Sequence, residues 1–77
     1  MIIKSYLAYP VTGQKQALVA ALQQIPQCEI TPSTNKDLIV IVTESADETA
    51  EQALEQQLHA IPSLLSLTLV SGHQEDI

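Results

Sequence analysis

The stretch LQQIPQCEI, residues 22–30, is matched in outline 36 residues later by LHAIPSLLSL, residues 58–67. Both stretches follow the pattern Leu-x-x-Ile-Pro-x-apolar. Because proline cannot continue a helix, each stretch is expected to end a helix at the isoleucine and to begin a strand after the proline. The repeat therefore predicts two equivalent corners, each joining a helix to a strand.

The segment before the first corner has the periodicity of an amphipathic helix. Its apolar residues recur at the spacing i, i+3, i+4 and i+7, which predicts a helix over residues 13–25. Thr12 is placed to cap the start of this helix, and Pro26 ends it. The predicted apolar face consists of Leu18, Ala21, Leu22 and Ile25.

The segment before the second corner predicts another helix, over residues 46–60. Ser45 and Glu48 have the Ser-x-x-Glu spacing of a capping box, in which each side chain accepts a hydrogen bond from the other residue's backbone amide. The predicted inner face carries Ala50, Leu54, Leu58 and Ile61, and the predicted solvent-exposed face carries Glu48, Glu51 and Glu55.

Four segments are predicted to be strands, because they are rich in β-branched, aromatic or other apolar residues or alternate between apolar and polar residues. They are residues 2–9, 27–31, 38–43 and 64–70. The order β-α-β-β-α-β predicts an α+β, ferredoxin-like sandwich: a four-stranded antiparallel sheet with two helices on one face. Pro32 indicates an edge for the second strand, and the unbroken apolar run LIVIVT indicates a central third strand. We expect residues 1–71 to form a single domain and residues 72–77 to form a loose acidic tail.

Two helices on one face leave the opposite face of the sheet open. Its centre is expected to be apolar and to be ringed by hydroxyls and a carboxylate, which makes it a candidate contact surface. A homodimer contact, or the ordinary exposure of apolar side chains, would explain it equally well. The parity of residues 38–43 is the least determined, because both sides of that strand are apolar. By alternation the open face would carry Lys4, Tyr6, Ala8, Glu29, Thr31, Ile39, Ile41, Thr43, Ser66, Thr68 and Val70.

Charge narrows the range of partners. Three lysines, no arginine and nine carboxylates give a net charge of -6. This charge repels phosphate backbones and anionic lipid surfaces, so neither nucleic acid nor a membrane is an expected partner. A cationic partner would be attracted instead.

The sequence offers no constellation for catalysis. Cys28, His59 and His73 lie on different elements without metal-ligand spacing, and no glycine-rich phosphate loop is present. Cys28, next to Ile30 on the apolar side of a strand, is expected to be a buried small hydrophobe. We therefore expect neither an enzyme nor a metal or cofactor site. The absence of a secretory signal and of a disulfide pair predicts a cytoplasmic protein.

Three stretches, IPQCEI, LIVIVTESADE and LLSLTLVSGHQED, together resemble the NapD family of chaperones for the periplasmic nitrate reductase. The resemblance runs from Ser5 to Glu75. The chain departs from the family pattern at Gln27, Asn35-Lys36, Ser63 and Ser71-Gly72. The family's motifs fall on Pro26, Cys28, Glu29 and Ile30, on residues 38–44, and on Leu69, Val70, His73 and Glu75.

The resemblance implies a ferredoxin-like chaperone that binds the twin-arginine signal peptide of the nitrate reductase catalytic subunit and holds back export until the molybdenum cofactor is inserted. The acidic chain and the predicted open face suit a ligand with a basic region followed by an apolar stretch. The eleven open-face residues are then the predicted peptide site of a monomer or weak homodimer. Whether the peptide binds as helix or strand stays open.

The alternative is a small-molecule-sensing regulatory domain of the ACT or Lrp/AsnC kind, which shares the same order of elements. Such domains tend to carry glycine-containing loops at their ligand interface and to be attached to a further domain. Gly13 and Gly72 are the two glycines of this chain. A thermal stability that rose with an added amino acid would favour this alternative.

Overall fold

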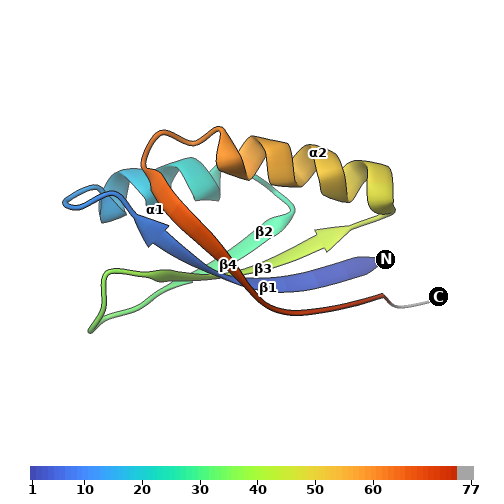
Figure 1. Cartoon of the computed structure of the whole chain (residues 1–77), viewed down its shortest axis with the longest axis horizontal. Coiled ribbons are helices and arrows are strands. Elements are labelled where there is room, and N and C mark those ends of the chain that lie inside the picture. Colours follow the sequence, from blue (N-terminus) through green and yellow to red (C-terminus); the bar gives the residue numbers. More distant parts are fainter. Residues whose placement is uncertain (75–77) are drawn as a thin grey trace.

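In a computed structural model that describes residues 1–74, the chain forms one sheet and two helices (Figure 1). The sheet has the strand order β2-β3-β1-β4, and each neighbouring pair is antiparallel. Both helices cover the same face of the sheet. The predicted ferredoxin-like fold is confirmed, with β1 and β3 in the centre. The elements are β1 (Ile2–Pro10), α1 (Lys15–Gln23), β2 (Cys28–Pro32), β3 (Ile39–Ser45), α2 (Glu48–His59) and β4 (Leu64–Gln74).

The two repeated corners have the same backbone hydrogen bonds. After α1, the amide of Ile25 donates to Leu22 O at 3.1 Å and the amide of Cys28 donates to Ile25 O at 3.1 Å. After α2, Ile61 donates to Leu58 O at 3.2 Å and Leu64 donates to Ile61 O at 3.1 Å. In both corners the chain tightens to a three-residue turn at the isoleucine, and the proline lies where no amide is needed.

The core lies between the helices and the covered face of the sheet. It is aliphatic apart from Tyr6, and the sequence contains no phenylalanine or tryptophan. Each helix contributes leucines at helical spacing, and the sheet contributes alternate residues of its two central strands. The buried hydrophobic residues are Tyr6, Ala8, Leu18, Leu22, Ile25, Ile39, Ile41, Leu54 and Leu58.

The helix caps differ from the predicted ones. α1 begins after Gln14 with no side-chain cap, so Thr12 does not cap it. α2 is capped by Asp47, whose side chain accepts a hydrogen bond from the amide of Ala50 at 2.8 Å. Ser45 is still part of β3, and its buried hydroxyl has no hydrogen-bond partner among residues 1–74. The capping box was wrong because β3 runs two residues further than the apolar run indicates.

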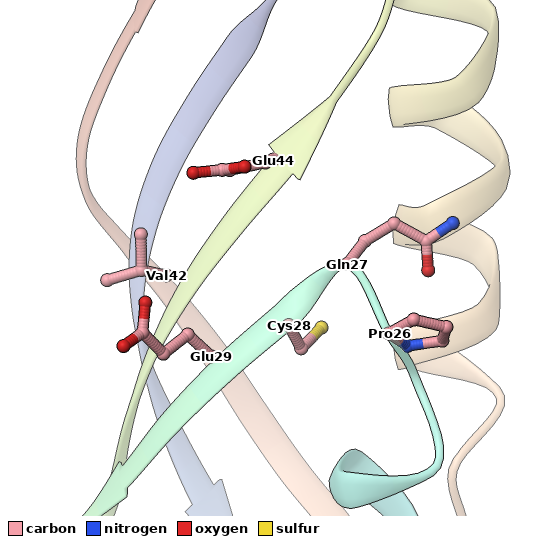
Figure 2. Close-up of a pocket in the computed structure, with 6 residues that line it drawn as sticks. All are labelled: Pro26, Gln27, Cys28, Glu29, Val42 and Glu44. Atoms are coloured by element: carbon pink, nitrogen blue, oxygen red, sulfur yellow. The ribbon is translucent and has the colours of Figure 1, made fainter.

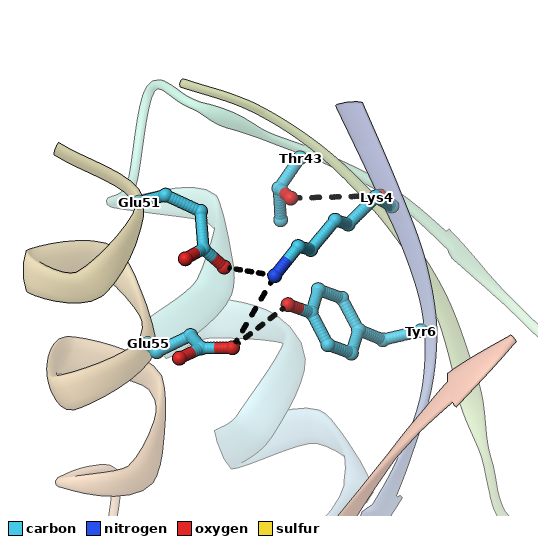
Figure 3. A network of polar contacts seen from close by, with 5 residues as sticks. All are labelled: Lys4, Tyr6, Thr43, Glu51 and Glu55. Carbon is cyan, nitrogen blue, oxygen red and sulfur yellow. Dashed lines mark hydrogen bonds and ion pairs between the residues drawn. The ribbon is translucent and has the colours of Figure 1, made fainter. Parts of the chain in front are cut away.

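The predicted solvent-exposed face of α2 is also wrong at one position. Glu51 is only 8% exposed, and Lys4 Nζ donates to its Oε1 at 2.6 Å (Figure 3). Glu55 Oε1 accepts from the Tyr6 hydroxyl at 3.4 Å and lies 3.7 Å from Lys4 Nζ. The hydrogen bond to Glu51 raises the pKa of Lys4, and burial raises the pKa of Tyr6 to about 12. These contacts tie α2 to β1 at physiological pH.

β4 is longer than the predicted strand over residues 64–70, because it pairs with β1 as far as Gln74. Two register shifts leave Leu65 and Val70 without a directly opposed residue in β1. Residues 75–77 of the predicted acidic tail lie outside the described residues. The domain boundary at residue 71 stays a prediction.

Asp47→Ala should lower the free energy of unfolding by about 1 kcal/mol, because the amide of Ala50 loses its acceptor. Ser45→Ala, three residues before Glu48, should change it by less than about 0.5 kcal/mol, since its hydroxyl caps nothing. Urea unfolding of both variants checks the assignment. If Ser45→Ala lowered the free energy of unfolding more than Asp47→Ala does, Ser45 rather than Asp47 would be the cap of α2.

Lys4→Met should lower the free energy of unfolding by about 1–3 kcal/mol, because it keeps the side-chain volume but leaves the buried carboxylate of Glu51 unpaired. Lys36→Met removes the same charge at an exposed position and should cost less than about 0.5 kcal/mol. Equal effects of the two substitutions on the urea midpoint would show that the Lys4 ion pair contributes no stability.

Candidate functional site

The structure contradicts the predicted open face in its two central strands. Ile39, Ile41 and Thr43 are at most 1% exposed, and Tyr6 and Ala8 are also buried. All five lie on the helix-covered side. The parity of β3 could not be decided from its composition. Tyr6 pairs with Ile41, and directly paired residues lie on the same side of the sheet. The predicted parity is therefore wrong for β1 as well as for β3.

Lys4 follows the same parity as Tyr6 and is half-buried against α2, where it binds Glu51. It does not lie on the open face. Val70 is exposed, but it lies at the register shift between Ser5 and Tyr6 and therefore has no directly opposed residue in β1. The other four predicted residues, Glu29, Thr31, Ser66 and Thr68, are exposed and belong to the two edge strands.

The open face is made of rows of residues paired across the sheet. One row joins Glu29, Val42, Ser5 and Ser71, and the next joins Thr31, Val40, Leu7 and Thr68. The face thus has an apolar centre from β1 and β3 and a polar margin from β2 and β4. Sequence reasoning missed its central members, although the opposite choice of parity for residues 2–9 and 38–43 would have found all but Glu44, which lies beyond the predicted strand. They are Ile3, Ser5, Leu7, Tyr9, Val40, Val42 and Glu44.

Two carboxylates mark one end of this face. Glu29 and Glu44 are exposed and flank Val42, which pairs with Glu29 across β2 and β3. Figure 2 shows the three side chains on one side of the strands, while the Cys28 sulfur points to the other side. They line a surface pocket of about 410 Å³ together with Pro26, Gln27 and Cys28. Anionic oxygens beside an aliphatic surface are suited to a guanidinium with an apolar neighbour.

A second pocket of about 420 Å³ lies on the helix-covered side, between α2 and the β1–β4 pair. The Lys4–Glu51 ion pair lies at its wall and neutralises two of its charges. Gly72 belongs to the same wall, and a side chain there would approach Lys4 Cγ to 3.2 Å. The ion pair and Gly72 therefore have a structural role in packing β4 beside α2.

Other kinds of site find no support in the described part of the chain. Residues 1–74 contain no cluster of three or more histidine, cysteine or acidic side chains that could hold a metal ion. Neither helix is long and apolar enough to cross a membrane. Cys28 is half-buried, and burial raises the pKa of its thiol to about 11, which suppresses the reactive thiolate.

Comparison with known proteins identifies a family and a similar fold. The family model described as NapD protein matches residues 1–76. No curated protein matches the chain. Among solved structures, the chain is similar to a NIPSNAP domain protein from Burkholderia xenovorans, with a TM-score of 0.54 and 12% identity over 99% of this chain and 95% of that chain. At this identity the likeness concerns the fold alone.

The Cys28 thiol should react slowly with a disulfide reagent at pH 8. A pKa of about 11 in place of the ordinary 9.0 lowers the thiolate fraction about a hundredfold, so the unfolded chain in urea should react far faster than the native protein. Absorbance of the released thiol follows the reaction. Equal rates before and after unfolding would contradict burial of the thiol.

Proposed function

Because the chain belongs to the NapD family, a family of chaperones for nitrate reductase assembly, we propose that it binds the twin-arginine signal peptide of a periplasmic nitrate reductase precursor. It acts in the cytoplasm and holds back export until the cofactor has been inserted. The family assignment makes a chaperone, with no catalytic step of its own, the function to test.

The observation that carries this proposal is the combination of an apolar open face with two carboxylates at one end. A twin-arginine signal peptide has a basic region followed by an apolar stretch. Its arginines would meet Glu29 and Glu44, and its apolar residues would continue over Val42, Val40 and Leu7. The order of charge and apolar surface on the protein therefore matches the order along the ligand.

The two parts of the face contribute differently to binding. Val40 and Val42 are side chains of a central strand, so their positions are fixed before the peptide arrives, and little ordering entropy is lost on contact. Glu29 and Glu44 are exposed, and charge pairs in such places are partly screened by salt. Apolar burial should supply most of the affinity, and the carboxylates should set encounter rate and orientation.

The net charge of -6 supports the same partner. A basic peptide is attracted to the whole molecule before it contacts the open face, so association should be fast at low salt and slower at high salt. The four predicted residues that lie in edge strands, Glu29, Thr31, Ser66 and Thr68, remain in the proposed site. The central residues of the proposed site belong to the side of β1 and β3 opposite to the one that the sequence analysis predicts.

Glu29→Arg should raise the Kd for a twin-arginine signal peptide by about tenfold at low salt and should flatten its salt dependence, because like charges then face each other. Glu48→Arg makes the same change of net charge on α2, away from the open face, and serves as the matched control. Calorimetric titration measures both. A peptide with both arginines changed to glutamine should lose the difference between the variants.

Equal weakening by Glu29→Arg and Glu48→Arg would mean that only net charge matters and would remove the acidic end of the open face from the site. Absence of saturable binding by the unmodified protein would overturn the proposed function. In that case a stability screen with amino acids would test the regulatory-domain alternative.

A further inference from the structure

β4 presents a long free edge. The strand order places it at the margin of the sheet, with β1 on one side and no strand on the other side in the part of the chain that the structure describes. It has 11 residues, which at about 3.3 Å per residue gives an edge of about 36 Å. Half of its backbone amides and carbonyls point away from β1 and can accept a further strand.

The sequence of β4 lacks the features that usually protect such an edge. Residues 64–74, LLSLTLVSGHQ, contain no lysine, arginine, aspartate, glutamate or proline. The other edge strand, β2, is different: it has five residues, carries Glu29 and ends at Pro32. One edge of the sheet is therefore short and blocked, and the other is long and uncharged.

Exposed apolar side chains follow the same edge. Leu65 is 67% exposed, Leu69 is 53% exposed and Val70 is 60% exposed. Leu65 and Val70 lie at the two register shifts, where the strand departs from regular pairing with β1. Between the shifts, Ser66 to Leu69 pair with β1 residue by residue, so the middle of the edge keeps regular strand geometry.

We propose that the chain forms a symmetric homodimer through antiparallel pairing of two β4 edges. The charge distribution favours a second copy of the chain as the partner that pairs with the β4 edge. Two molecules of net charge -6 repel each other at most contacts, but β4 lets them meet along a strip that carries no formal charge. A twin-arginine peptide is drawn instead to the carboxylates of the open face, which β4 lacks.

The symmetry of this contact determines the shape of the dimer. Antiparallel pairing of identical edges requires a two-fold axis perpendicular to the sheet, so the two sheets join into one of eight strands. Both open faces then lie on the same side, and the four helices lie on the other. The dimer has two peptide sites side by side, with Ser66 and Thr68 of each copy near its centre.

The acidic turns of α2 do not oppose one another in this arrangement. Glu48 and Glu51 line a pocket with Leu69 and Gly72, so they lie beside the C-terminal half of β4. Antiparallel pairing places that half next to the N-terminal half of the partner's β4. The two acidic regions therefore fall at opposite ends of the interface, where repulsion between them is weakest.

Sedimentation equilibrium over a range of protein concentrations tests this proposal. The unmodified chain should pass from 8.4 kDa towards twice that mass as its concentration rises. Val70→Lys, one residue from the middle of β4, should raise the dimer Kd by about tenfold or more, because it brings two like charges near the two-fold axis. Val70→Thr keeps the β-branched shape without charge and should dimerise nearly as well.

Val40→Lys places the same charge on the open face and should leave the dimer Kd unchanged. Circular dichroism checks that each variant is folded. Hydrogen exchange gives an independent readout: the amides of residues 64–74 that point away from β1 should gain protection as protein concentration rises, and those of β2 should not.

Three outcomes overturn the proposal. The unmodified chain could stay monomeric up to millimolar concentration, or Val70→Lys could dimerise as well as Val70→Thr. Protection of β4 could also appear only when signal peptide is added, which would assign the edge to the peptide. Peptide binding measured by the Glu29→Arg titration is a separate result, so failure of the dimer and failure of the chaperone function are distinguishable.

Discussion

The register in which β1 pairs with β3 determines how every other part of the molecule is used. Tyr6 opposite Ile41 puts Ala8 opposite Ile39 on the helix-covered side and Leu7 opposite Val40 on the open side. Because side chains alternate, a slip of one residue in either strand would exchange core and surface residues of that strand. The β1–β3 register therefore determines both which residues form the core and which residues form the candidate binding face.

This register also puts a lysine beneath a helix. Lys4 shares the parity of Tyr6, so its side chain runs towards α2, and an ammonium that is partly withdrawn from water is stabilised by an anionic partner. α2 supplies Glu51 at 2.6 Å and Glu55 at 3.7 Å. Gly72 leaves room for the aliphatic part of Lys4 on the neighbouring strand. The ion pair thus lets β1 keep its register and lets β4 pass close beside it.

The repeat, the proline-ended helices and the order of elements were enough to predict the fold, because each rests on local chemistry. Which side of β1 and β3 faces the helices was not predictable in this way, since residues 38–43 are apolar on both sides. The position of Glu51 in the sequence indicates its burial. It lies three residues before Leu54 and seven before Leu58, on the apolar stripe of α2, where a carboxylate needs a cation or a hydrogen-bond donor as partner. In the structure Lys4 is this partner.

The open face and the β4 edge differ in their charge, and the contact that we propose for each follows from this difference. The open face carries carboxylates at one end and a fixed apolar centre, which suits the basic, partly apolar ligand that we propose for it. The β4 edge carries no formal charge over 11 residues, so it offers no charge complementarity to such a ligand and adds no like-charge repulsion between two copies. Two molecules of net charge -6 meet with less repulsion where their own charges are absent or far apart. Because the carboxylates lie on the face and not on the edge, the proposed recognition of a cationic ligand and the proposed pairing of two copies use different surfaces of the molecule.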